Sequence, residues 1–234
     1  MVVLKENLEK IDITKDIWED DIIFARFSAS EKSKKERLYN KFREKRSSFE
    51  KFINLFPGDL AKNIVRKNIK DMYGLELVDY DKIRTDNFEN NDPWDLKWKD
   101  YEIEVKSSIE KYNSSINNIL ENRRIIVFEN KGIKDIIIQV FFVYKDDYGK
   151  KIARLMGDNK EQEFINEGIR NIDEFIKIFR QHFTAIIAGF ITKDEACSNK
   201  GHLTFTKRGE CSRNYKNHFI MDSNSMDELV KKII

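Results

Sequence analysis

Residues 93–106 read Pro93-Trp-Asp-Leu-Lys-Trp-Lys-Asp-Tyr-Glu-Ile-Glu-Val-Lys106, and this stretch decides which side of the fold carries charge. Polar and apolar residues alternate strictly over 93–98 and again over 101–106, which is typical of strands with one buried face. We expect a hairpin that turns on Lys99-Asp100. A two-residue turn would set Asp95 opposite Glu104, with Lys106 further along the same polar face.

The polar face of this hairpin has two interpretations. Lys97 opposite Glu102 is an ordinary surface pair and fits a solvated face. Asp95 opposite Glu104 is different, because two carboxylates about 5 Å apart repel by about 3 kcal/mol at an effective dielectric near ~20. A cation between them would relieve the repulsion, and Mg²⁺ prefers one or two carboxylates together with water and phosphate oxygens. The spacing alone leaves both interpretations open.

Apolar patterns on either side of the hairpin predict the rest of the fold. A helix is expected from Asp59, as its N-cap, to Met72, with Gly74 ending it; another follows Asn171, and a last one begins near Ser225. The ranges with strand patterns are 75–78, 124–128, 136–144 and 186–191. Strands mixed with helices in this order predict an α/β fold with a central mixed β-sheet flanked by helices.

Basic residues gather in two places. Residues 31–46 hold eight Lys or Arg against three Glu and predict a basic helix that stops before Pro57-Gly58, with Lys35 and Arg43 as candidate phosphate contacts. The tail from Lys200 to His218 mixes Lys and Arg with Asn, Ser and Thr, which are side chains that contact base edges. The candidate DNA contacts in the tail are Lys207, Arg208, Arg213, Asn214 and Asn217.

Composition narrows the class of protein. The 43 Lys and Arg nearly balance the 41 Asp and Glu, so any nucleic-acid surface must come from local clusters. No apolar run reaches the length of a membrane span, and the charged N-terminal residues do not resemble a signal peptide, so we expect a cytoplasmic protein without a membrane partner. Cys197 and Cys211 are too few for a disulfide scaffold, and reduced thiols are favoured over a zinc site with His202 and His218.

Asp95, followed after eight residues by Glu104-Val105-Lys106, resembles the PD-(D/E)XK motif of a superfamily of Mg²⁺-dependent nucleases. In that motif an Asp begins one strand of a hairpin and Glu-X-Lys lies on the next strand. Here the Asp follows Pro93-Trp94 rather than Pro directly. The motif covers about fourteen residues, and the predicted order of helices and strands around it is similar to the restriction-endonuclease-like core.

The resemblance implies a catalytic trio of Asp95, Glu104 and Lys106. Asp95 and Glu104 would ligate Mg²⁺ with the backbone carbonyl of Val105, and Lys106 would orient and help deprotonate the attacking water. The superfamily often adds an acidic residue from a preceding helix, for which Asp59 and Glu50 are candidates. Glu102 is a candidate for a second metal ion, although pairing with Lys97 is favoured.

A short chain without helicase or methyltransferase motifs resembles a type II restriction endonuclease most. This resemblance implies a homodimer that cuts double-stranded DNA at a specific sequence. The alternatives are a repair or recombination nuclease such as a Holliday-junction resolvase, and a DNA-binding module without catalysis. We expect a single domain over 1–234, with a basic helical region (1–57), a catalytic core (58–192) and a basic C-terminal region for DNA recognition (193–234).

Overall fold

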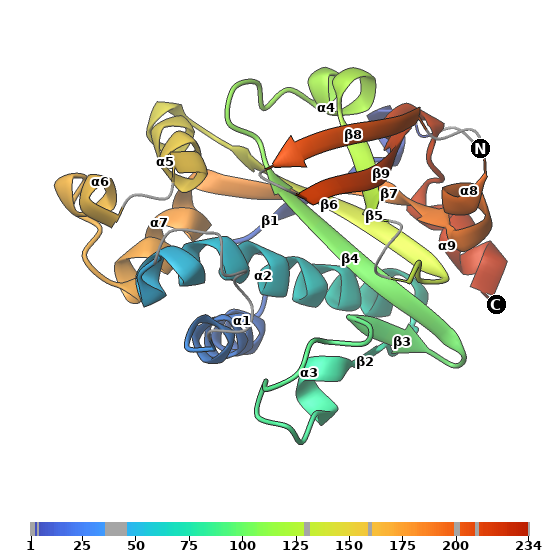
Figure 1. Cartoon of the computed structure of the whole chain (residues 1–234), viewed down its shortest axis with the longest axis horizontal. Coiled ribbons are helices and arrows are strands. Elements are labelled where there is room, and N and C mark those ends of the chain that lie inside the picture. Colours follow the sequence, from blue (N-terminus) through green and yellow to red (C-terminus); the bar gives the residue numbers. More distant parts are fainter. Residues whose placement is uncertain are drawn as a thin grey trace.

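The computed structural model describes residues 3, 5–35, 46–128, 132–158, 161–198, 202–208 and 211–233. Its main sheet is strongly curled and contains six strands (Figure 1). In their order along the sheet they are β1 (Glu9–Asp12), β7 (Phe183–Thr192), β6 (Ile136–Tyr144), β4 (Tyr101–Ile109), β3 (Leu96–Trp98) and β2 (Val78–Asp79). β4 and β6 run parallel, whereas the other neighbours are antiparallel. The predicted α/β class with a mixed sheet is therefore confirmed.

Helices cover one face of this sheet and a second, smaller sheet covers the other (Figure 1). The helical layer consists of α1 (Glu19–Ser33), α2 (Ser48–Tyr73), α5 (Asp147–Asp158), α6 (Glu161–Asn166) and α7 (Ile172–His182). The opposite layer consists of β5 (Arg124–Phe128), β9 (Cys211–Phe219) and β8 (His202–Arg208), with α4 (Ile116–Asn122) beside them. Short connecting helices are α3 (Tyr80–Ile83), α8 (Lys193–Cys197) and two 3-10 turns (Lys5–Asn7, Ile220–Asp222), and α9 (Met226–Ile233) comes last.

Strand β6 contributes to both apolar cores. Ile138 and Phe142 pack against the helices, whereas Ile137 and Phe141 pack against the smaller sheet. A strand with both faces covered needs apolar residues at consecutive positions, which explains its nearly unbroken Ile, Val and Phe sequence. The strands predicted over 124–128 and 136–144 are confirmed, and the strand predicted over 186–191 is longer than expected.

Helix α2 corrects one prediction. It begins after Ser47, whose hydroxyl accepts from the Glu50 N–H while the Glu50 carboxylate accepts from the Ser47 N–H. It then passes through Pro57-Gly58 without a break and ends at Gly74 with φ 68°. The predicted stop before Pro57 is wrong, and so is the role of Asp59 as an N-cap. Proline removes one helical hydrogen bond, but buried apolar residues precede and follow Pro57, so packing holds the helix together.

The predicted basic helix over 31–46 is also wrong in its first part. Helix α1 begins at Glu19 and ends at Ser33, so Lys35 lies beyond its end. Arg43 lies outside the described residues. No helix within the described ranges is long and apolar enough to cross a membrane.

Candidate active site

The hairpin of β3 and β4 has the predicted register. Leu96 pairs with Ile103, Lys97 with Glu102 and Trp98 with Tyr101, so Lys99 and Asp100 form the two-residue turn. Lys99 takes a left-handed conformation with φ 51°. Because side chains alternate along each strand, Glu104 and Lys106 lie on the face opposite the buried Ile103 and Val105.

Three hydrogen bonds fix Asp95 just before β3. Its N–H donates to the Ile103 carbonyl (3.1 Å), and its own carbonyl accepts from the Tyr80 N–H (3.2 Å). Its carboxylate oxygen Oδ2 accepts from the Val105 N–H at 2.7 Å. The side chain is therefore directed toward β4, and no described residue donates a hydrogen bond to Oδ1.

Glu104 and Lys106 lie next to this carboxylate. The Lys106 ammonium donates to Glu104 Oε1, and within the described part of the chain Glu104 Oε2 accepts no hydrogen bond. Both side chains are half-buried. Asp95 and Glu104 line the same hollow of about 120 Å³, whose other lining residues are Asp92, Pro93, Trp94, Gly132 and Lys134. Each of the two carboxylates thus brings one available oxygen to this part of the surface.

The electrostatic surroundings of Asp95 oppose its charge. Burial raises the pKa of Asp95 to about 6, and Glu104 adds to the rise, whereas Lys62 and the Val105 N–H lower it. One unit of pKa corresponds to about 1.4 kcal/mol between the two protonation states. A cation near Oδ1 would favour the ionised form.

Behind Asp95 lies a buried ion network that sequence reasoning missed. Lys32 of α1 pairs with Asp59 (2.7 Å), Asp81 (2.7 Å) and Asp92 (3.3 Å). Lys62 of α2 pairs with Asp81 and approaches Asp59 at 3.5 Å and Asp79 at 3.7 Å. Lys32 was expected to belong to a basic helix with candidate phosphate contacts, but it is 9% exposed. Its burial identifies it as part of the core beneath the motif.

Arg84 joins the network to the loop before the motif. Its guanidinium pairs with Asp81 (2.9 Å), Asp92 (2.6 Å) and Asp86 (2.7 Å), and donates to the Asn90 carbonyl (2.8 Å). The buried guanidinium of Arg84 therefore contacts several residues of the loop over 81–92 and holds them together. The segment over 81–92 is rich in polar residues. Its Asp residues are the feature of the sequence that could have indicated this ion network.

The network contains more carboxylates than its cations neutralise. Burial raises the pKa values of Asp59 and Asp79, and the nearby lysines only partly oppose this. Burial acts on Asp81 in the same direction, but Lys62 and Lys32 outweigh it and its pKa is lowered. A net negative charge thus remains in the network.

The three additional acidic candidates, Asp59, Glu50 and Glu102, have different partners in the structure. Asp59 lies in the network behind the trio. Glu50 is occupied elsewhere, because its two carboxylate oxygens accept from the Ser47 and Glu161 N–H groups. Glu102 pairs with Lys134 at 2.9 Å, which corrects the expected ion pair with Lys97.

The DNA-contact candidates of the tail lie on the hairpin of β8 and β9, which pairs with β5 through β9. Lys207 and Arg208 occupy β8, and Arg213, Asn214 and Asn217 occupy β9; only their backbone is described. We call the three basic residues of this set the β8–β9 cations. Lys35 is half-buried after α1.

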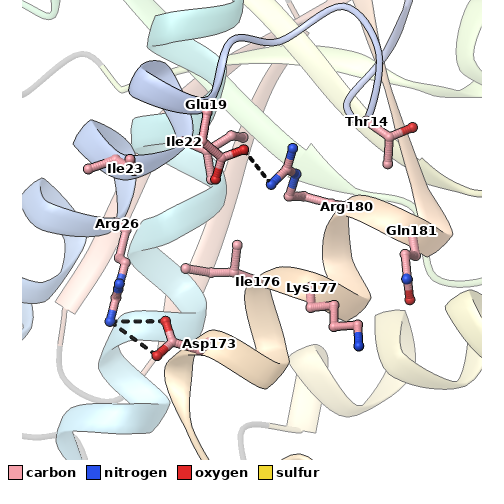
Figure 2. Close-up of a pocket in the computed structure, with 10 residues that line it drawn as sticks. All are labelled: Thr14, Glu19, Ile22, Ile23, Arg26, Asp173, Ile176, Lys177, Arg180 and Gln181. Atoms are coloured by element: carbon pink, nitrogen blue, oxygen red, sulfur yellow. Dashed lines mark hydrogen bonds and ion pairs between the residues drawn. The ribbon is translucent and has the colours of Figure 1, made fainter.

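A larger groove of about 350 Å³ lies between α1 and α7 (Figure 2). Two ion pairs cross it, Glu19 with Arg180 at 2.8 Å and Arg26 with Asp173 at 2.9 Å, and the apolar Ile22 and Ile176 also line it. No carboxylate pair comparable to Asp95 and Glu104 lines it, so the smaller hollow at the motif is the better candidate for chemistry.

Comparison of the chain with protein-family models, curated proteins and solved structures gave no significant match.

Proposed function

We propose that this chain is a Mg²⁺-dependent endonuclease of the PD-(D/E)XK kind that hydrolyses phosphodiester bonds in double-stranded DNA. The observation that carries the proposal is the pair of available oxygens, Asp95 Oδ1 and Glu104 Oε2, on side chains that line one hollow beside Lys106. The order of elements supports it as well. Helix α2, the β3–β4 hairpin, the parallel strand β6, α7 and β7 follow one another as in a restriction-endonuclease-like core.

The donor set suits Mg²⁺. Within the described residues no group of three or more His, Cys, Asp or Glu side chains could hold a metal ion. An ion at the hollow would therefore have two carboxylates, the Val105 carbonyl and oxygens of water and phosphate, the mixture that Mg²⁺ prefers. It would also offset the negative charge that the buried lysines leave uncompensated. The thiol and imidazole ligands that Zn²⁺ prefers are absent from the lining of the hollow.

The residues of the hollow have distinct roles in this reaction. When bound, Mg²⁺ supplies positive charge against the charge that builds on the phosphorus oxygens. The Val105 N–H holds the Asp95 carboxylate toward β4, so its orientation does not depend on substrate. Lys106, held against Glu104, lies where its amine can orient the attacking water and assist removal of its proton.

Among enzymes of this kind we propose a type II restriction endonuclease that acts as a homodimer. The trio would cut the strand, and the β8–β9 cations with Asn214 and Asn217 would contact the DNA. Type II enzymes must recognise base edges, and a two-stranded ribbon is one of the elements that the major groove admits.

Digestion of a defined plasmid with Mg²⁺ tests the proposal. We expect discrete fragments for the wild-type chain and no cutting by Asp95→Asn. The matched control is Asp100→Asn, in the hairpin turn, which should cut like the wild type. A smear would refute the sequence-specific form of the proposal. Intact plasmid with folded wild-type protein over a panel of DNA sequences, or cutting by Asp95→Asn, would refute the assigned site.

A further inference from the structure

Two ammonium groups lie among the carboxylates directly behind the candidate metal site. The side chains of Lys62 and Lys32 are 4% and 11% exposed, and both contact Asp81, whose side chain is fully buried. Asp92, which lines the hollow together with Asp95, faces Lys32 at 3.3 Å. Positive charge is therefore already present next to the lining of the hollow.

Each carboxylate of the network already pairs with one of these lysines or with Arg84 through at least one oxygen. Asp81 faces Arg84 with Oδ1 and both lysines with Oδ2. Asp92 faces Arg84 at 2.6 Å with Oδ1 and Lys32 at 3.3 Å with Oδ2. Asp59 and Asp79 each direct Oδ1 toward Lys62, and Oδ2 of each is buried without a described hydrogen-bond partner. A divalent ion in this group would therefore lie beside two ammonium groups that are already desolvated and paired.

We propose that Lys62 and Lys32 take the place of a second divalent ion, so that each chain binds a single Mg²⁺, at Asp95 and Glu104. The inference rests on the proposed function, because it concerns the same metal site. A lysine tethered to a packed helix keeps its charge in place, so part of the negative charge of the network is offset without recruitment of an ion from solution. Lys62 and Lys32 are positioning residues in this account, since neither lines the hollow.

The test is the number of Mn²⁺ ions bound per chain, measured from the electron paramagnetic resonance signal of free Mn²⁺ with the full chain. We expect one ion for the wild type. Lys62→Met should bind a second ion, because it frees oxygens of Asp79 and Asp81 for a new cation. A merely structural lysine would not change this number. Lys32→Met serves as the second variant, and circular dichroism confirms that each protein is folded.

Arg66→Met is the matched control. Arg66 lies four residues after Lys62 on α2 and also pairs with an α1 residue, Asp21, but that pair does not belong to the network. The control should lose some stability and still bind one ion. Two ions on the wild-type chain would overturn this inference and leave the proposed function intact. One ion on both folded lysine variants would also overturn it. No ion on the wild type would refute this inference together with the metal site.

Discussion

Asp81 offers the sharpest test of the buried network, because it faces three cations. Its side chain is fully buried and accepts from Lys32 at 2.7 Å, from Arg84 at 2.9 Å and from Lys62. In the variant Asp81→Asn, Lys32 still pairs with Asp59 at 2.7 Å. The remaining carboxylates near Lys62 are those of Asp59 at 3.5 Å and Asp79 at 3.7 Å. Lys62 therefore bears most of the loss, as a buried charge without a close partner.

The magnitude follows from the burial of this ion pair. Removal of one partner from a buried pair costs about 3 to 5 kcal/mol. We expect the lower value, because the substitution also removes one of the excess negative charges. The urea m-value of a chain of 234 residues should be near ~3 kcal/mol per M, so the unfolding midpoint should fall by about 1 M.

Urea unfolding followed by circular dichroism measures this shift. The control is Asp71→Asn, which removes an exposed pair with Lys67 on the same helix α2 and should cost less than about 0.5 kcal/mol. A midpoint for Asp81→Asn within about 0.3 M of the wild type would refute the argument, since the network would then contribute little to the stability of the fold.

Three further predictions concern the motif, the C-terminal hairpin and α2. Glu104→Gln should abolish Mg²⁺-dependent cleavage, while DNA affinity measured in Ca²⁺ stays equal or rises because one negative charge near the phosphate is lost; weaker DNA binding would contradict this role. Alanine at a β8–β9 cation that contacts phosphate should weaken binding to all duplexes and reduce the salt slope by about one unit. We expect at least one of the three to lose about 1 to 3 kcal/mol on the cognate duplex alone; equal losses on cognate and scrambled duplexes for all three would move recognition elsewhere. Ser47→Ala should lower the free energy of unfolding by about 1 kcal/mol through loss of the α2 cap, and an unchanged urea midpoint would contradict the capping role.

Local patterns predicted the motif hairpin well. Strict alternation over 93–98 and 101–106, with an assumed two-residue turn at Lys99-Asp100, predicted a register that buries Leu96 and Ile103. The structure has that register, although β3 begins only at Leu96. The apolar run of β6 was equally informative, because a strand covered on both faces has few polar positions to obscure the pattern. Asn171 was also identified correctly as a helix cap.

Predictions failed where a residue's role depends on partners distant in sequence. From the neighbouring sequence, Lys32 was interpreted as part of a basic helix and Asp59 as a helix N-cap. In the structure they form an ion pair in the core. Pro57 was expected to end a helix, but α2 begins at the Ser47 cap and continues past Pro57, where tertiary packing stabilises it. The network behind Asp95 combines α1, α2 and the loop before β3, and no periodicity in one segment could have revealed it.

The pairing of β1 with β7 has a consequence for synthesis of the chain. β1 forms near the N-terminus, but its partner β7 begins at Phe183, so most of the chain must leave the ribosome before this edge can close. Helices α1 and α2 adjoin in sequence and contact each other, so they can associate much earlier. Until β7 is made, β6 presents an open strand edge rich in Ile, Val and Phe. Synthesis that stops between Tyr144 and Phe183 should therefore release fragments that aggregate by strand pairing.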